Sequence, residues 1–212
     1  MWLGFRRGWG WLQAADSSSL RLLHHVAVKH PLWVRFWELF CDVFSPGTFR
    51  LLGLGAAMIV LSRRRWHAAL LVLVSVEFSE LVSLTAKGLA NRPRPATALV
   101  HASSSAFPSG HALCSIVGVL TLLTVSLPVT SRLKEVVAAV MGALVVLAVG
   151  FGRVALNVHH PSDVVAGWAL GYLYFALCWA VSGVGGWRLR RRRASVPGPG
   201  SDASRSACPR SV

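Results

Sequence analysis

Three short polar segments interrupt an otherwise apolar chain, and each carries residue types suited to phosphate chemistry. The first runs from Lys87 to Pro95, where prolines alternate with Arg92 and Arg94. Proline fixes its own φ and restricts the residue before it, so this segment is stiff and holds successive side chains apart. Cations at fixed positions suit a bound anion. The alternative is that basic side chains at a helix end reach towards lipid headgroups.

The second segment, 107–111, reads Phe-Pro-Ser-Gly-His and precedes a long apolar run. Ser109 is a favourable helix N-cap, and Gly110 leaves the first free amides of the helix open to a ligand. Those amides and the partial positive charge of a helix N-terminus together form an anion site. His111 then lies in the first helical turn. Taken alone, this segment favours a plain helix cap over an active site.

The third segment contains Arg153, His159 and Asp163. Asp163 follows His159 by four residues, so its carboxylate can reach one imidazole nitrogen if a helix begins near Ser162. Such a partner fixes the tautomer and raises the basicity of the other nitrogen. The alternative, which is favoured when the segment is taken alone, makes the histidines interfacial polar residues and the aspartate an ordinary charge at a helix N-terminus.

The elements that must position these segments are membrane helices. The 212 residues are 54% hydrophobic and 14% charged, yet the formal net charge is +14, and apolar and cationic stretches alternate along the chain. This composition excludes a disordered or collagen-like chain and disfavours an ordinary soluble domain. Runs without charge cover 51–62, 66–76, 109–131, 136–152 and 164–187.

A membrane-spanning helix needs about 20 mostly apolar residues. The last three runs qualify with small extensions, whereas the first must extend back to Ser45 and the second must pass Glu77 and Glu80 to reach Ala86. The sequence therefore predicts an all-α, multi-span transmembrane helical bundle of about five spans. The two glutamates share a helix face, either as supporting groups for Lys87 or as buried structural residues.

Basic residues fall in alternate gaps between these spans: Arg63 to Arg65, Arg132 with Lys134, and Arg188 with Arg190 to Arg193. The positive-inside bias assigns those gaps and the C-terminus to the cytoplasm, so 87–108 and 153–163 lie on the extracytoplasmic face of the cell membrane. All three polar segments then meet on one surface. Basic residues beside spans are the ordinary expectation, and we predict no nucleic-acid partner.

Together, the three segments supply what metal-independent phosphoryl transfer needs. Cations neutralise the phosphoryl oxygens, one imidazole attacks, and another protonates the departing oxygen. The sequence resembles the type 2 phosphatidic acid phosphatase superfamily, membrane lipid phosphatases related to bacterial acid phosphatases and vanadium haloperoxidases. Its three motifs match Lys87 with Arg94-Pro95, then Pro108 to His111, then Arg153, His159 and Asp163. Gly152 stands where the family usually has serine, which removes one hydroxyl that could contact phosphate.

The resemblance implies a role for each matched residue. His159 would be the nucleophile that forms a phosphohistidine, Asp163 would orient it, and His111 would be the acid for the leaving group and then the base for water. The residues implied to hold phosphate are Lys87, Arg94, Arg153, Ser109 and the amide of Gly110. Arg92 and His160 lie outside the motif positions, and we treat them as supporting residues.

The predicted function is hydrolysis of a membrane lipid phosphate or diphosphate. A polyprenyl diphosphate, phosphatidate and phosphatidylglycerol phosphate are all compatible, with a weak preference for the first. The alternatives are a lipid phosphotransferase and a catalytically silent membrane scaffold of the same fold. No pattern indicates a metal site, a disulfide or a cofactor, and none predicts the oligomeric state.

We divide the chain into an N-terminal segment (1–46), a transmembrane phosphatase core (47–187) and a basic, disordered cytoplasmic tail (188–212). From Ser17 to Phe44 apolar residues recur at helical spacing with a break before Pro31, which predicts an amphipathic interfacial helix with Trp33 and Trp37 at headgroup depth. The predicted topology places this helix on the extracytoplasmic side of the membrane. We predict no cleaved signal, and a chain that starts outside raises the alternative of a further span upstream.

Overall fold

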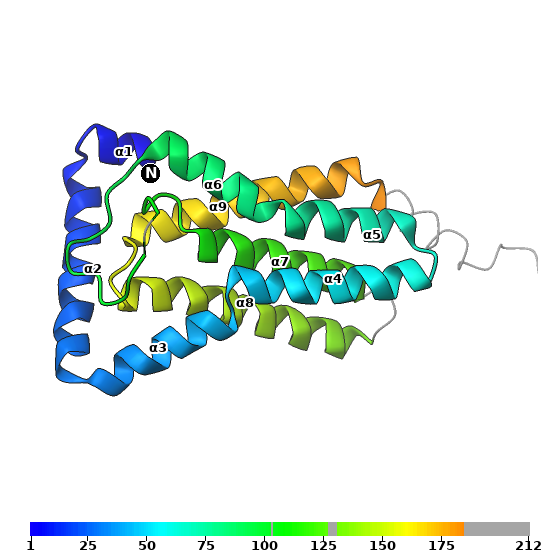
Figure 1. The fold of residues 1–212 in the computed structure, drawn as a ribbon, viewed down its shortest axis with the longest axis horizontal. Helices are drawn as coiled ribbons and strands as arrows, with labels where there is room; N and C mark the ends of the chain where they lie inside the picture. Colours follow the sequence, from blue (N-terminus) through cyan, green and yellow to red (C-terminus); the bar gives the residue numbers. More distant parts are fainter. Residues whose placement is uncertain (103, 127–130, 185–212) are drawn as a thin grey trace, which may run out of the picture.

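The structure, a computed structural model, describes residues 1–102, 104–126 and 131–184 (Figure 1). Within these ranges the regular secondary structure is entirely helical, as the sequence predicts. The N-terminal helices are α1 (Trp2–Arg6), α2 (Gly10–Lys29) and α3 (Pro31–Val43). The bundle helices are α4 (Pro46–Ser62), α5 (Trp66–Val72), η1 (Leu73–Glu77), α6 (Ser79–Ala90), α7 (Gly110–Ser126), α8 (Arg132–Ala155) and α9 (Pro161–Val181). The predicted tail at 188–212 lies outside the described residues.

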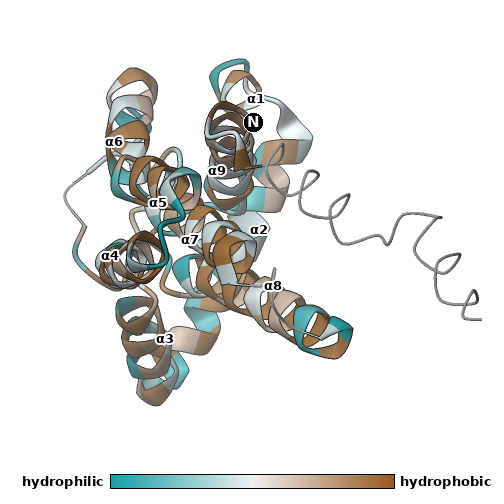
Figure 2. Ribbon diagram, turned by 90° about the vertical axis from the view of Figure 1, so that its right-hand side faces the viewer, coloured by the Kyte–Doolittle hydropathy of each residue, from teal (hydrophilic) through white to brown (hydrophobic). Residues whose placement is uncertain are grey.

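The bundle helices have the length and apolar character of membrane spans. Four segments qualify: Pro31–Ser62, Trp66–Ala90, Arg132–Ala155 and Pro161–Val181; the shorter apolar helix Gly110–Ser126 completes the predicted five. Large apolar side chains face outwards along the bundle, including Met58 (68% exposed) and Leu173 (64% exposed), and hydrophobic colouring extends along the helices in Figure 2. Lipid, rather than water, suits such a surface.

The N-terminal segment differs from the predicted interfacial helix over 17–44. The predicted break before Pro31 is confirmed and divides the segment into two helices, but the first begins earlier than predicted, at Gly10. The chain turns at His30, and Pro31 occupies the first turn of α3, where its missing N–H costs nothing. α2 lies across one end of the bundle, whereas α3 runs obliquely along its side (Figure 1). Trp37 of α3 packs against Phe151 of α8, with ring centroids 5.0 Å apart.

Helix α7 is the centre of the bundle and contacts α4, α6, α8 and α9 (Figure 2). Its contact with α9 is close because two glycines of α9 face the α7 backbone. A Cβ atom at Gly167 would lie 2.5 Å from the Ser109 carbonyl oxygen, and one at Gly171 would lie 2.8 Å from the Leu113 carbonyl oxygen. Small residues let membrane helices approach in this way. The first turns of α7 and α9 are therefore held side by side.

The second predicted span is not a uniform helix, because the five residues of η1 form a π-helical turn. Glu77 at the end of η1 and Glu80 in α6 face α4. Arg50 Nε lies 3.2 Å from Glu77 Oε2, and Arg50 Nη1 lies 2.8 Å from Glu80 Oε2. The glutamates thus pair with a cation of another helix. Their pairing supports the structural role, but neither side chain is buried as that role predicted, since they are 21% and 45% exposed. The sequence did not indicate Arg50 as the partner.

Candidate active site

The three polar segments meet at one end of the bundle, the end that α2 crosses (Figure 1). Lys87 lies in the last turn of α6, and His111 lies in the first turn of α7. Arg153 lies in the last turn of α8, and Asp163 lies in the first turn of α9. Helix ends from four different parts of the chain therefore bring these segments together, as the predicted topology requires.

A cavity of about 480 Å³ opens at this end. Five predicted residues line it: Lys87, Arg94, His111, Arg153 and His159. Other lining residues were not predicted: Glu38, Asp42, His101 and Ser104. Ser109, Gly110 and Asp163 do not line the cavity. Gly110 lies beside Lys87, and Asp163 Oδ2 lies 3.8 Å from His159 Nδ1. The cavity thus has three cations and two motif imidazoles on its wall.

Ser104 bridges two of the three cations. Lys87 Nζ donates to Ser104 Oγ at 2.9 Å, and Arg94 Nη2 donates to the same atom at 3.2 Å. Arg94 Nε also donates to the Ser104 carbonyl oxygen at 2.8 Å. Burial, and then the charge of Arg153, lowers the pKa of Arg94 below its ordinary value. A bound anion would relieve both the burial cost and this repulsion.

Two buried polar groups near the cavity have no hydrogen-bond partner among the described residues, Arg153 Nε and Ser109 Oγ. Ser109 is fully buried and occupies the predicted position before α7, but its hydroxyl makes no cap hydrogen bond. Its amide instead donates to the Asp163 carbonyl oxygen at 3.0 Å. Buried polar groups are normally paired, so these two are available to a ligand such as phosphate.

Gly110 permits the close contact between α6 and α7. A Cβ atom there would lie 2.9 Å from Ser83 Oγ and 3.7 Å from Lys87 Nζ. A side chain would therefore displace the helix that carries the cation. The predicted reason for glycine at this position was open access for a ligand, and the structure adds this packing requirement.

His159 is 1% exposed and anchored at one nitrogen. Nδ1 lies 2.7 Å from the Ala106 carbonyl oxygen, to which it donates when it carries the proton. Nε2 is then free of a proton and lies 3.4 Å from Arg94 Nη1. Burial lowers the pKa of His159 to about 4, although the nearby Asp163 carboxylate opposes this shift. The imidazole is therefore neutral at pH 7, with its lone pair available at Nε2.

The predicted hydrogen bond from Asp163 to His159 needs correction. Asp163 Oδ2 lies 3.8 Å from His159 Nδ1, which is too far for a hydrogen bond. Because α9 begins at Pro161, the carboxylate folds back over the helix start, and Oδ2 accepts the His160 amide at 2.8 Å. The Ala106 carbonyl orients His159, while Asp163 contributes negative charge nearby.

Gly152 faces away from the cavity. A Cβ atom there would lie 2.8 Å from Cys41 Sγ and 2.8 Å from Trp37 Cε3, both on α3. A serine at this position would meet α3 rather than a phosphate in the cavity. The expected loss of a phosphate contact is therefore replaced by a packing explanation, since glycine lets α3 approach α8.

Several contributors to the site were missed by the sequence prediction. Ser104 and the Ala106 carbonyl occur in a segment without a recognisable spacing. Asp16, which bonds to Arg92, is the only acidic residue among the first 37. This isolation is the one feature of the sequence that could have indicated a role for Asp16, because a single carboxylate in a basic, apolar segment is unusual.

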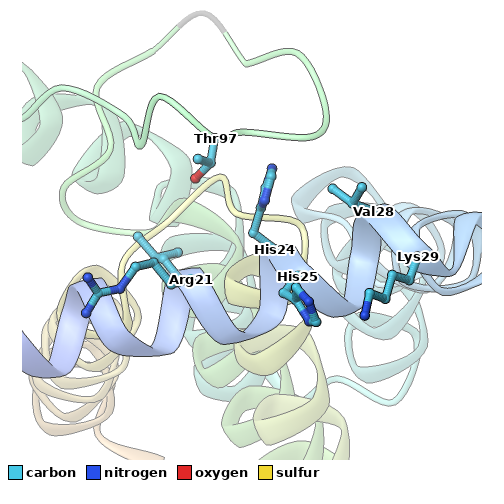
Figure 3. A pocket seen from close by; sticks show the side chains of 7 residues that line it. Arg21, His24, His25, Val28, Lys29 and Thr97 are labelled. Carbon is cyan, nitrogen blue, oxygen red and sulfur yellow. The ribbon is translucent and has the colours of Figure 1, made fainter.

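A second cavity, of about 320 Å³, lies between α2 and Thr97. Figure 3 shows Arg21, His24, His25 and Lys29 on the α2 side of it. No residue of the three polar segments contributes to this wall. Nor, in the part of the chain that the structure describes, do three metal-ligating side chains converge on one point. We therefore assign the active site to the cavity that both motif histidines line, which is larger than the one beside α2.

Comparison with known proteins identifies relatives of this chain. The sequence model of the PAP2 superfamily matches residues 68–186, more than half of the chain. Phosphatidylglycerophosphatase B of Bacillus subtilis (strain 168) is 38% identical over 128 residues, 58% of this chain and 62% of that protein. Undecaprenyl-diphosphatase of Sulfolobus acidocaldarius is 42% identical over 65 residues, 31% of this chain and 28% of that protein. The matches thus span less than two thirds of either relative.

A solved structure has the same fold. It is the crystal structure of a transmembrane PAP2-type phosphatidylglycerolphosphate phosphatase from Bacillus subtilis. The TM-score is 0.69 at 27% sequence identity, and the superposition covers 85% of this chain and 88% of that chain. The likeness therefore extends beyond residues 68–186, which the family model matches.

Proposed function

The chain belongs to the PAP2 superfamily, and from this premise we propose that it hydrolyses a phosphate ester or diphosphate of a membrane lipid through a phosphohistidine at His159. The observation that carries this proposal is the composition of the larger cavity. Two imidazoles, His111 and His159, and three cations line the same 480 Å³ space. A phosphoryl group there has a nucleophile, an acid and charge neutralisation within one cavity.

The proposed reaction has two steps. In the first, His159 Nε2 attacks phosphorus and the bond to the lipid oxygen breaks. His111, which takes up a proton when the negative charge of the substrate is bound beside it, gives that oxygen its proton. In the second, His111 takes a proton from water, the oxygen of that water bonds to phosphorus, and the phosphorus–nitrogen bond breaks to release phosphate. The neutral His159 imidazole supports the first step, because a protonated Nε2 could not attack.

Lys87, Arg94 and Arg153 are proposed to hold the phosphoryl oxygens, helped by Ser109 and Gly110. Their positions support this role, since the first three line the cavity and Ser109 Oγ lacks a partner among the described residues. Asp163 is proposed to keep the turn before α9 in place. No metal ion or organic cofactor takes part in the proposed steps.

The substrate class is proposed from the relatives. Phosphatidylglycerol phosphate is the first candidate, because the relative with the longer match and the solved structure are both named for it. A polyprenyl diphosphate is the second candidate, supported by the shorter match to an undecaprenyl-diphosphatase. The preference drawn from the sequence alone is thereby reversed.

We propose that the cavity opens at the extracytoplasmic face and that the C-terminus is cytoplasmic. The connection between α4 and α5, which carries Arg63, Arg64 and Arg65, lies at the end of the bundle away from α2 (Figure 1). The positive-inside bias places that connection in the cytoplasm. A lipid with its tail in the bilayer can then present its phosphate to the cavity from the outer headgroup layer.

The experiment that tests the function measures phosphate release by the purified full chain in detergent. The panel contains phosphatidylglycerol phosphate, undecaprenyl diphosphate and phosphatidate. We expect His159→Ala to lose at least about 1000-fold in kcat, since loss of the nucleophile should exceed the about 100- to 1000-fold cost of losing one charge-stabilising donor. His24→Ala, an imidazole outside the larger cavity, should retain wild-type turnover.

Wild-type turnover by His159→Ala would reject the mechanism. An inactive wild type on the whole panel would favour the silent scaffold. Transfer of labelled phosphate to an acceptor lipid, instead of release into water, would assign a phosphotransferase.

A further inference from the structure

Four side chains from three separate parts of the chain form a buried polar network beside the active site. They are Asp16 of α2, Arg92 of the segment after α6, and Ser162 with Asp163 at the start of α9. All four are at most 5% exposed. Asp16 lies well before residue 68, where the match to the family begins.

Arg92 joins the two carboxylates. Its Nη2 donates to Asp16 Oδ2 at 2.9 Å, and its Nη1 donates to Asp163 Oδ1 at 2.6 Å. Nη1 also donates to Ser162 Oγ at 2.8 Å. The guanidinium group lies over the Phe5 ring, 4.3 Å from its centroid, so α1 covers the network from outside.

Asp16 also holds the start of α9 directly. Its Oδ1 accepts the Ser162 amide at 3.0 Å, and its Oδ2 accepts the Ser162 hydroxyl at 2.6 Å. The first amides of a helix have no partner within the helix, so a carboxylate from α2 supplies one here. α2 is thereby bonded to the turn that follows His159.

A buried ion network is seldom needed for stability alone, because apolar side chains of similar volume often stabilise a fold as well. This network, however, ends on Asp163, whose second oxygen accepts the amide of His160, the residue after the proposed nucleophile. Its chain of contacts runs from α2 through Arg92 and Asp163 to the turn 159–163. The atoms it fixes are those that set the position of His159.

We infer that Asp16 and Arg92 are positioning residues for the hydrolysis proposed above, and that α2 is part of the active-site structure. The inference rests on the proposed function, since it assigns His159 as the nucleophile. Asp16 fixes Arg92 and the start of α9, Arg92 fixes Asp163, and the turn then presents His159 Nε2 to the cavity. Neither residue lines the cavity that contains His111 and His159, although Arg92 lines a neighbouring cavity that shares Arg94 and Ser104 with it.

The first test is Asp16→Asn, which keeps the shape of the side chain and removes its charge. We expect kcat to fall about 10- to 100-fold, the usual effect of losing a partner that orients a reacting side chain. KM should change less than about twofold, since Lys87, Arg94 and Arg153 are untouched. The matched control is Glu135→Gln, which also removes the charge of a carboxylate paired with an arginine. Glu135 lies at the end of α8 opposite to the cavity, about 27 Å from Arg153 along the helix.

The second test uses a double substitution to show that Asp16 acts through Arg92. In an Arg92→Gln background, Asp16 and Asp163 face each other without the cation between them. Adding Asp16→Asn there should restore kcat or leave it unchanged, whereas the same change in the wild type lowers it. Additive losses would overturn the inference, as would a wild-type kcat for Asp16→Asn.

If Asp16→Asn does not fold, Ser162→Ala replaces it. This variant removes one hydroxyl that bonds both Asp16 and Arg92, and we expect a fall in kcat of about 3- to 10-fold. Unchanged kcat in a folded Ser162→Ala would also overturn the inference.

Orthovanadate and inorganic phosphate provide a readout that needs no lipid substrate. Vanadate imitates the phosphoryl transition state and depends on the position of the nucleophile, whereas phosphate depends mainly on the cations. Asp16→Asn should weaken vanadate binding at least about 10-fold and phosphate binding less than twofold, and equal weakening would overturn the inference. The His159→Ala experiment separates the two proposals. Wild-type turnover by His159→Ala would reject the proposed function, whereas a wild-type kcat for Asp16→Asn would reject only the positioning role.

Discussion

At the scale of single residues, the position of His159 decides how the site can work. The side chain is buried, its Nδ1 faces the Ala106 carbonyl oxygen, and its Nε2 faces Arg94. A histidine in water is half protonated near pH 6.5. Burial disfavours the charged form, so this imidazole stays neutral under acidic conditions that would inactivate an exposed histidine nucleophile.

The pH dependence of kcat/KM should reveal this environment. Because the pKa of His159 is lowered to about 4, protonation of Nε2 occurs only as the pH falls towards that value. We therefore expect kcat/KM to fall on the acidic side of its pH profile only well below pH 6.5. The titration of the substrate phosphate is measured separately and its contribution to this acidic limb is subtracted. Asp163→Asn should move the limb to still lower pH, since loss of a nearby negative charge makes protonation less favourable. A limb centred near pH 6.5 would show that His159 is solvated.

Sequence reasoning could identify the three cations and two motif histidines of the cavity wall, but neither the rest of its lining nor most of the hydrogen bonds that hold it. Lys87, Arg94, Arg153 and the two histidines have a type and spacing that indicate phosphate chemistry, and the structure places them around one cavity. Ser104 and Asp16 have no such pattern. Their contacts join residues 10 or more positions apart, and in the case of Asp16 and Ser162 the separation is 146 positions, which no local periodicity encodes.

At the scale of elements, the contact between α7 and α9 positions the site. Two glycines bring these helices together at their first turns, where Ser109 and Asp163 bond through the backbone. The five apolar segments were predictable from hydropathy. The π-helical turn was not, because its register is fixed by contacts between helices, such as Ser75 Oγ to Thr121 Oγ1 at 2.8 Å. The direction of α2 across the bundle likewise depends on Asp16 and Arg92 rather than on its own periodicity.

Substitution of Gly167 by alanine should damage both stability and activity. The new Cβ would lie 2.5 Å from the Ser109 carbonyl oxygen, so the start of α7 must move. Overpacking of this kind typically costs about 1–3 kcal/mol, and displacement of His111 should lower kcat/KM as well. Thermal unfolding in detergent and phosphate release would measure the two effects. Gly55→Ala is the control, since no described atom lies within 4 Å of its added Cβ; equal behaviour of the two variants would contradict the prediction.

At the scale of the whole molecule, the proposed active site and the cluster of arginines that predicts the membrane orientation lie at opposite ends of the bundle. The end that α2 crosses carries the proposed active site. The other end carries Arg63, Arg64 and Arg65, which predict a cytoplasmic location (Figure 1). The proposed reaction uses Lys87, Arg94 and Arg153, which would account for cations on both sides of the predicted membrane. A positive-inside count that included these cations would favour the predicted orientation less strongly.

Sidedness can be measured with two serine-to-cysteine variants in otherwise matched backgrounds. Ser18 on α2 and Ser62 at the end of α4 are both exposed, whereas Cys41, Cys114 and Cys178 are buried and should react slowly. With Cys208 replaced by serine, a membrane-impermeant maleimide should label Ser18→Cys in intact spheroplasts. Ser62→Cys should be labelled only after permeabilisation, because the positive-inside bias places it in the cytoplasm. The reverse pattern would move the proposed active site to the cytoplasmic face, where a lipid phosphate would have to be presented from the inner leaflet.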